Sequence, residues 1–470
     1  MNFYNNLNNF SNKFIFTSEA YSVTYSQIIS VCDEFSSYTK GKSLLFLLCS
    51  NTEEAIAGYL SCLRSGTVPL LISSSINESL LLNLIYKYSP NYIWLPKIRT
   101  IPENFITIFS HGNYVLVRPN QSKYHNLNND LALLLMTSGS TGSPLLVRQS
   151  YKNLHSNTSS IIESLNILPD DKPITTLPFN YTYGLSIINT HLACGCQIIL
   201  SEKSIIDKDF WNLLNIHKAT TFGGVPYTYQ MLDRIGFEKM NLPYLKTITQ
   251  AGGKLEKKLS LKFAEICQKK SINFIVMYGQ TEATARMSYL PSGYSISKAG
   301  SIGIAIPGGK FILENEEGNE IIKTNESGEL VFKGENVCLG YAENPDDLSK
   351  GDENNGLLRT GDIGKFDEDG FYYIEGRIKR FIKIFGNRVS LDEIENIAKE
   401  NNFNCVCSGR DDKLYIFSEE INILLDLKKL ISKITGFHPT SIETFSIQKI
   451  PRNESGKVQY SELDKLIEKI

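Results

Sequence analysis

Several familiar signals are missing from this sequence, and each absence argues against a class of protein. The nine cysteines include no Cys-x-x-Cys pair, so buried free thiols in a reducing cytoplasm are a simpler interpretation than a zinc site. No apolar run reaches the roughly 18 to 20 residues that cross a membrane, and the N-terminus lacks a basic segment followed by an apolar core. The formal net charge of −2 gives no overall attraction to nucleic acid. We therefore expect a cytoplasmic protein with no nucleic-acid partner and no membrane span.

What the chain does have is length and a regular alternation of strand and helix patterns. Its 470 residues are enough for two or more domains. Apolar runs at residues 44–49, 68–72 and 92–95 predict strands, and the amphipathic patterns between them predict helices. Such alternation implies right-handed crossovers and a parallel sheet, so the sequence predicts an α/β fold. The alternation resumes after residue 150, with further strands expected at residues 174–177, 197–200, 220–222, 247–250 and 274–277.

The pattern changes in the last third of the chain. Short β-rich pieces broken by Gly and Asp occupy residues 300–374 and include a strong hairpin signal at residues 365–374. After a basic segment that begins at Gly376, the remaining residues show a mixed α/β pattern. We predict a large N-terminal domain, residues 1–378, made of mixed and parallel sheets with flanking helices plus a β-rich subdomain. We predict a small, mobile α+β C-terminal domain at residues 379–470.

A loop rich in hydroxyl groups follows the strand expected at residues 131–136. Glycine lets backbone N–H groups surround an anion, and Ser and Thr hydroxyls donate further hydrogen bonds to phosphate oxygens. The alternative is an ordinary solvated Ser/Gly loop, and no Gly-Lys-Ser/Thr follows at the spacing of a Walker loop. The candidate phosphate-binding residues are Thr137, Ser138, Gly139, Ser140, Thr141 and Gly142.

Four further stretches carry polar and charged groups. Residues 278–284 follow an expected strand, which places them at the carboxyl edge of the sheet, where ligands collect. Asp362 stands at the start of the expected hairpin, a basic segment at residues 376–388 marks the domain junction, and Lys457 lies in a turn near the end. Each has a structural alternative: Glu282 could cap a helix, Asp362 could hold a turn, and Lys457 could be a surface charge.

Taken together, the five motifs resemble, in order and spacing, the adenylate-forming (AMP-binding) superfamily of acyl-CoA synthetases, peptide-synthetase adenylation domains and luciferase. The resemblance runs from about residue 25 to residue 457. It implies an enzyme that uses ATP and Mg²⁺ to join a small carboxylic acid to AMP, with loss of pyrophosphate. The resulting acyl-adenylate then passes to a thiol, and we expect coenzyme A as the acceptor. The alternative acceptor is the phosphopantetheine of an acyl carrier protein. The alternative to an enzyme is a non-catalytic nucleotide-binding relative.

The resemblance also implies roles for individual residues. The loop at residues 137–142 would hold the β- and γ-phosphates, Thr281 would contact the α-phosphate, and Glu282 would bind Mg²⁺, which suits a hard carboxylate. Lys379 matches the hinge about which the small domain turns, and Lys457 matches the lysine that reaches the reacting carboxylate and the α-phosphate. In the remaining assignments, Tyr278 and Gly279 lie at the adenine, Gly252 and Gly253 pass close to it, and Asp362 accepts hydrogen bonds from the ribose with Arg377 beside it.

Two departures from the family pattern bear on function. Where the family loop ends Pro-Lys-Gly, Pro144 is followed here by Leu145 and Leu146, so the cation expected near the pyrophosphate is missing. Arg148 is the candidate substitute, and we favour compensation by it. The acid-binding segment has Tyr181 where the family often has His, and it offers no Asp to pair with an ammonium group, which disfavours an α-amino acid substrate. The acid pocket is expected to be partly apolar and to include Tyr181, Tyr183 and Gly224.

Overall fold

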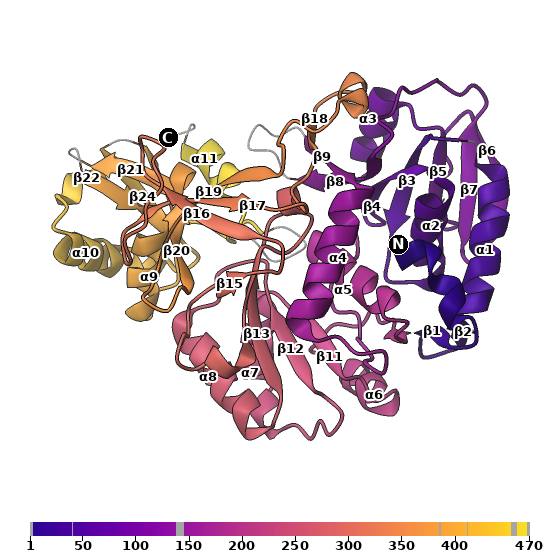
Figure 1. The fold of residues 1–470 in the computed structure, drawn as a ribbon. Helices are drawn as coiled ribbons and strands as arrows, with labels where there is room; N and C mark the ends of the chain where they lie inside the picture. The colour runs from indigo at the N-terminus through magenta and orange to yellow at the C-terminus, as the bar shows by residue number, and fades with distance from the viewer. Residues whose placement is uncertain are drawn as a thin grey trace. The chain divides into compact units, whose positions relative to one another are not determined.

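The computed structural model describes residues 3–39, 41–137, 145–384, 387–410, 412–452 and 458–467. The chain forms two compact units: the first contains Met1–Lys310 and Lys333–Leu358, and the second contains Phe311–Phe332 and Arg359–Ile470. Both units combine sheets with flanking helices, which confirms the predicted mixed α/β fold (Figure 1). The boundary at residues 378/379 remains a prediction.

The first unit is built on an eight-stranded sheet. Its central strands β8, β4, β3 and β5 are parallel, whereas β9 and β18 on one edge and β7 and β6 on the other run antiparallel to their neighbours. In spatial order the strands are β18 (Gly340–Ala342), β9 (Leu145–Ser150), β8 (Leu131–Thr137), β4 (Val68–Ser73), β3 (Leu44–Cys49), β5 (Tyr92–Pro96), β7 (Tyr114–Pro119) and β6 (Phe105–His111).

Helices cover both faces of this sheet, which is why β3 is apolar along its whole length. Leu45 and Leu47 face one core, which includes apolar residues of α1, α2, α4 and α5. Leu44 and Phe46 face the other core, which includes residues of α3. These helices are α1 (Tyr25–Tyr38), α2 (Glu53–Ser65), α3 (Glu78–Tyr88), α4 (Tyr151–Leu165) and α5 (Thr182–Ala193).

A five-stranded sheet forms the other half of the first unit. Three parallel strands are followed by two antiparallel ones, namely β11 (Thr221–Gly224), β12 (Thr247–Gln250), β13 (Asn273–Tyr278), β14 (Ser288–Leu290) and β15 (Ile304–Ala305). Aromatic side chains of α7 (Pro226–Arg234) and α8 (Lys257–Lys269) pack on one face, where Tyr229 meets Phe263 and Phe274. Residues of α4 and α5 pack on the other, so these two helices lie between the two sheets (Figure 1). A small sheet of β1 (Phe14–Thr17), β2 (Ser22–Thr24) and β10 (Ile198–Ile199), and helix α6 (Lys208–Ile216), complete this unit.

The second unit contains two sheets and a hairpin. A four-stranded sheet has the order β16 (Lys310–Glu314), β17 (Gly328–Lys333), β19 (Leu357–Phe366) and β20 (Tyr372–Arg377). The hairpin β21 (Phe381–Ile384) and β22 (Asn387–Ser390) leads to a three-stranded sheet of β23 (Val406–Arg410), β24 (Lys413–Ser418) and β25 (Ile442–Ser446). That sheet packs on α9 (Leu391–Glu400) and α10 (Leu424–Thr435) with one face and on α11 (Tyr460–Ile467) with the other.

Most strands predicted from apolar runs are present, and one prediction is wrong. The strands at residues 44–49 and 247–250 have the predicted bounds, and Lys365 pairs with Tyr373 in the predicted hairpin. Residues 174–177 form no strand, because only Pro173 and Ile174 make single bridges, to Thr221 and Ile199 respectively. The run is buried because it connects two sheets, and burial alone does not distinguish a connector from a strand.

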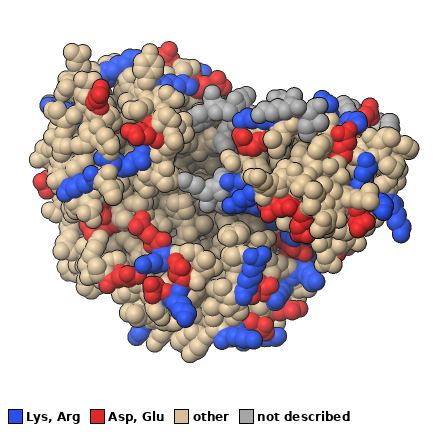
Figure 2. Space-filling model, turned by 180° about the vertical axis from the view of Figure 1, so that it is seen from behind, with Lys and Arg blue, Asp and Glu red and all other residues tan. Residues whose placement is uncertain are grey.

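The surface is mixed in charge, and none of the described helices is both long and apolar enough to cross a membrane. On the face that Figure 2 presents, Lys and Arg are interspersed with Asp and Glu, without a large area of one sign among the described residues. This distribution matches the small net charge of the chain.

Candidate active site

The centre of the candidate site is the turn that follows β13, residues 278–286. Gly279 is required by close packing, because a Cβ at this position would lie 1.7 Å from the Ala285 carbonyl oxygen. Thr284 has a positive φ of 64°, which is costly for a β-branched residue and is concentrated at functional sites in proteins. The chain therefore adopts a tight, strained turn immediately after the predicted adenine residue Tyr278.

Hydrogen bonds from distant parts of the first unit hold this turn. The Gln149 side chain donates from Nε2 to the Thr281 carbonyl oxygen at 3.0 Å, and the Cys338 backbone N–H donates to the Glu282 carbonyl oxygen at 2.8 Å. Asn336 donates from Nδ2 to the carbonyl oxygens of Ala283 and Arg286, both at 2.9 Å. These bonds fix the backbone that carries the predicted catalytic pair, Thr281 and Glu282.

The Glu282 carboxylate is oriented by a tyrosine that the sequence analysis missed. Tyr341 of β18 donates its hydroxyl to Glu282 Oε1 at 2.8 Å. Burial, followed by the negative charge of Glu282, raises the pKa of Tyr341, so the phenol stays protonated and remains a donor. Nothing in the sequence indicated this contact, because Tyr341 is 59 residues from Glu282 in the chain and reaches it only in the folded structure.

One carboxylate with a second oxygen available fits the requirement of Mg²⁺. Among the described residues, Glu282 Oε2 accepts no hydrogen bond, and no cluster of three His, Cys, Asp or Glu side chains forms an all-protein metal site. Mg²⁺ is commonly bound through one or two carboxylates together with substrate phosphates. Glu282 can therefore serve as the protein ligand in such an arrangement.

The predicted phosphate loop connects two neighbouring antiparallel strands. Thr137 ends β8 and pairs with Leu145, which begins β9, and its hydroxyl donates to the Leu145 carbonyl oxygen at 3.4 Å. Ser138, Gly139, Ser140, Thr141 and Gly142 lie outside the described residues. The residues at which the loop begins and ends are thus adjacent across a strand pair.

The expectation that Arg148 replaces the missing loop cation is wrong. Its side chain is completely buried, and its guanidinium donates to the carbonyl oxygens of Tyr341, Leu339, Lys350 and Gly351 at 2.5 to 3.2 Å. It also forms an ion pair with Glu353. All its strong donors are used to fix β18 and the segment after it, so Arg148 cannot turn toward a phosphate without breaking this network.

The residues predicted for the acid pocket come together with the Gly252 loop. Gly252 has a φ of 84°, and a Cβ there would lie 2.4 Å from the Tyr181 hydroxyl oxygen. The Tyr183 hydroxyl donates at 2.9 Å to the carbonyl oxygen of Thr249, which lies near the end of β12, just before that loop. A Cβ on Gly224 would meet Thr228 at 2.8 Å, and one on Gly253 would be 3.2 Å from Pro226. The glycines thus allow the loops after β11 and β12 to pack closely.

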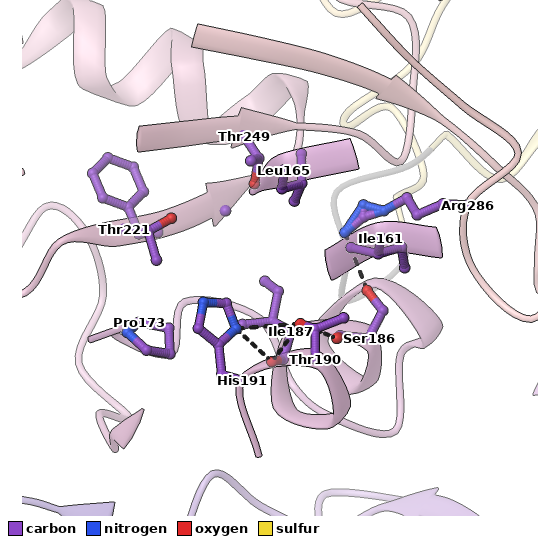
Figure 3. A pocket seen from close by; sticks show the side chains of 12 residues that line it. Ile161, Leu165, Pro173, Ser186, Ile187, Thr190, His191, Thr221, Thr249 and Arg286 are labelled. Atoms are coloured by element: carbon purple, nitrogen blue, oxygen red, sulfur yellow. Dashed lines mark hydrogen bonds between the residues drawn. The ribbon is translucent and has the colours of Figure 1, made fainter. Parts of the chain in front are cut away.

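Beside Tyr183 lies a small cavity, around which Figure 3 shows the lining side chains. Ile161 and Leu165 of α4 and Ser186, Ile187, Thr190 and His191 of α5 line it, with Thr221, Gly223 and Thr249 from the five-stranded sheet. Burial lowers the pKa of His191 to about 4, so its imidazole is neutral near pH 7. Arg286, at the end of the 278–286 turn, contributes a cation to this cavity.

In the second unit, Asp362 and Arg377 are partners, as predicted. They face each other across β19 and β20, and Arg377 Nε donates to Asp362 Oδ1 at 2.9 Å. Asp362 is buried at 2% exposure, which makes its carboxylate a well-positioned acceptor. Lys379 lies in a short 3₁₀ helix, Ile378–Arg380, but its side chain is not described, and Lys457 lies outside the described residues.

A family model described as "AMP-binding enzyme" matches residues 3–342, well over half of the chain. The chain belongs to this family. The matched region contains the loop, the 278–286 turn and Tyr341, and it ends before Asp362.

Curated relatives of the chain include two CoA ligases and a luciferase. The 2-succinylbenzoate–CoA ligase of Bacillus licheniformis is 27% identical over 71% of this chain and 70% of its own length. The oxalate–CoA ligase of Arabidopsis thaliana is 29% identical over 71% and 67%. The luciferin 4-monooxygenase of Luciola mingrelica is 28% identical over 62% of this chain, and the match spans only 52% of the luciferase.

Solved structures match the whole fold. The o-succinylbenzoate CoA synthetase of Bacillus subtilis with its acyl-adenylate has a TM-score of 0.81 at 20% identity and covers 98% of this chain and 97% of its own. The same enzyme with ATP and a magnesium ion gives a TM-score of 0.77 at 21% identity, with coverages of 98% and 99%. At this identity the likeness establishes the fold.

Proposed function

We propose that this protein activates a small carboxylic acid with ATP and Mg²⁺ and transfers the acyl group to the thiol of coenzyme A. The observation that carries the proposal is the 278–286 turn, in which a fixed backbone and Tyr341 hold the Glu282 carboxylate. Holding a carboxylate in one orientation costs conformational entropy, and the same turn contains a strained residue, Thr284. Such an arrangement is useful where a metal and phosphates must be positioned.

The proposed reaction has two steps. In the first, a carboxylate oxygen of the acid attacks the α-phosphorus of ATP, the bond between the α-phosphorus and its bridging oxygen breaks, and pyrophosphate leaves. In the second, the thiol sulfur attacks the acyl carbon, AMP leaves, and the thiol proton passes to solvent. Bound Mg²⁺ neutralises phosphate charge in the first step.

Individual residues of the first unit have distinct parts in this proposal. Glu282 holds the metal, Thr281 donates its hydroxyl to the α-phosphate, and the loop after Thr137 surrounds the outer phosphates. Tyr278 and the Gly252 loop form the surroundings of the adenine. Tyr181 and Tyr183 line the acid side. From the remaining predictions, Asp362 accepts from the ribose hydroxyls, and Lys379 and Lys457 serve as hinge and as the cation at the reacting carboxylate.

Two alternatives differ from this proposal in one part each. An enzyme that loads a carrier protein would use the same adenylate and the same kind of thiol arm, so only the acceptor differs. A non-catalytic nucleotide-binding relative is suggested by Leu145, which replaces the loop lysine. The oriented Glu282 argues against it, because a protein that only bound nucleotide would gain little from a carboxylate placed among phosphates.

The first experiment is exchange of labelled pyrophosphate into ATP across a panel of carboxylic acids, including 2-succinylbenzoate and oxalate. We expect at least one acid to support exchange, and Glu282→Gln to lower it by about 100-fold or more with melting unchanged. The matched control is Glu265→Gln, the same change at an exposed position of α8. Equal exchange in Glu282→Gln and Glu265→Gln would overturn the assignment of the site.

The second experiment identifies the acceptor. The acid that supports exchange is supplied with ATP and with either coenzyme A or a phosphopantetheinylated carrier protein, and thioester formation is measured by mass. Thioester on the carrier but not on coenzyme A would replace the proposed acceptor with the alternative one.

A further inference from the structure

Arg286 is a buried cation without a counter-charge. Its side chain is 3% exposed, and none of the ion pairs among the described residues includes it. Its Nη2 donates to the Ser186 hydroxyl at 3.1 Å, and its Nη1 reaches only the Met277 sulfur, a weak acceptor, at 3.2 Å. Its Nε is buried and has no hydrogen-bond partner. The guanidinium also lies over the Tyr183 ring, 4.1 Å from the ring centroid, so a cation–π contact covers one face.

Two other buried arginines show how this chain satisfies such a group when its role is structural. Arg148 binds four carbonyl oxygens and Glu353, as described above. Arg380, in the second unit, forms ion pairs with Asp392 and Glu395. Arg286 has neither a carboxylate nor a carbonyl partner for its guanidinium among the described residues. Burying it in this state destabilises the fold relative to an apolar residue, so a structural role does not account for it.

The other residues that line the cavity around Arg286 contribute no negative charge to it. Figure 3 shows its guanidinium entering the cavity from one side, with His191 on the opposite side and Ser186 and Thr190 below. The Ser186 and Thr190 hydroxyls donate to helix carbonyl oxygens, and His191 Nδ1 donates to the Ile187 carbonyl oxygen. The N–H groups of Arg286 are therefore the donors that this side of the cavity offers an anion. None of the residues that line this cavity is an Asp or a Glu.

The cavity also lies next to the predicted acid-binding residues. Tyr183, which covers one face of the Arg286 guanidinium, is 6.3 Å from Tyr181 between ring centroids. Tyr181 in turn contacts the Gly252 loop. A molecule whose reacting end lies at Tyr181 and Gly252 would therefore have Arg286 near its far end.

We infer that the substrate is a dicarboxylic acid, whose non-reacting carboxylate binds Arg286 in this cavity. The inference rests on the proposed function, because it names the class of acid that the site activates. A guanidinium matches a carboxylate in geometry, since parallel N–H groups can donate to both oxygens. The unpartnered Nε donates to one carboxylate oxygen, and binding supplies the negative charge that the fold leaves out.

The test compares each dicarboxylic acid with its monomethyl ester in pyrophosphate exchange. Succinate, glutarate and adipate keep two charges, whereas the half-esters keep the reacting carboxylate and lose the remote charge. For the best chain length, the wild-type kcat/KM should be at least about 30-fold higher for the diacid than for the half-ester. Arg286→Met should bring the two within about threefold, mainly by raising KM for the diacid, and Arg286→Lys should restore part of the preference.

Controls separate this inference from folding and from the proposed function. Arg234→Met makes the same change at an exposed position of α7 and should keep the wild-type preference. Thermal melting without ATP provides a readout independent of activity: the diacid should raise the melting temperature of the wild type more than the half-ester or chloride does. Because this measurement uses the wild type alone, it tests the inference even if Arg286→Met does not fold.

The outcomes are distinguishable. If half-esters serve as well as diacids in the wild type, or if folded Arg286→Met keeps the preference, the dicarboxylate inference is overturned while the ligase proposal stands. If chloride stabilises the wild type as much as the diacid, Arg286 binds a small inorganic anion and the inference is again overturned. If no acid supports exchange but the diacid alone still stabilises the wild type, the proposed function fails and the anion site is retained.

Discussion

Tyr341 provides a sensitive test of how the candidate metal ligand is held. In Tyr341→Phe, Glu282 loses the hydrogen bond of 2.8 Å while the ring can keep its place on β18. Hydrogen bonds to charged groups contribute about 1.5–3 kcal/mol. Tyr341 is 41% exposed, so water replaces part of the lost interaction, and we expect about 1 kcal/mol, or roughly a fivefold effect. Because the phenol orients the carboxylate, the loss should appear as weaker binding of Mg²⁺.

The assay is pyrophosphate exchange at saturating acid and ATP with Mg²⁺ varied. The concentration of Mg²⁺ for half-maximal exchange should rise about fivefold in Tyr341→Phe, with thermal stability nearly unchanged. Tyr86→Phe is the control, because Tyr86 is 90% exposed on α3. An unchanged Mg²⁺ dependence would refute the orienting role. A lower Mg²⁺ requirement would refute it too, since it would mean that the phenol competes with the metal for Glu282.

Three further changes test other parts of the site. Leu145→Lys should improve the apparent affinity for ATP severalfold in exchange assays, because Arg148 is committed to its buried network; an unchanged KM for ATP would show that no loop cation is needed. Lys457→Ala should abolish most exchange yet still convert a supplied acyl-adenylate to thioester, whereas Lys379→Pro, with φ locked, should do the reverse; equal loss of both steps in both folded variants would exclude a rotating small domain. The folded protein holds the pKa of His191 near 4 and the unfolded chain takes the proton near 6.5, so stability should fall between pH 6.5 and pH 4 by at most about 1.4 kcal/mol per pH unit. Urea unfolding of His191→Asn should show a flatter pH dependence than wild type, and an equally steep one would place the cause elsewhere.

The sequence was most informative where local pattern and tertiary environment agree. The continuous apolar run of β3 predicted a strand buried on both faces, and helices do cover both faces. Periodicity could not reveal that Leu145–Ser150 pairs antiparallel to β8, because the intervening loop has no regular pattern. The apolar run at residues 174–177 led to a wrong strand prediction, since a buried connector and a buried strand have the same apolar composition.

The candidate site also contains residues that the sequence could predict and residues that it could not. The motifs selected Glu282 and Asp362 as candidates, and the predicted position of Arg377 beside Asp362 is confirmed by their hydrogen bond. Tyr341 and Arg286 could not be assigned from sequence, because their proposed roles depend on contacts made by strand pairing and helix packing.

The contrast between Arg148 and Arg286 explains why charge patterns alone mislead. Both are arginines close to family motifs, and sequence reasoning selected Arg148 because it follows the loop that lacks a lysine. Burial is equally severe for both, but only Arg148 has carbonyl and carboxylate partners that replace its hydration. A fully satisfied buried cation has no free donor for a ligand, whereas an unsatisfied one retains an uncompensated cost that a bound anion removes. The arginine with the poorer set of protein partners is therefore the better candidate for a binding role.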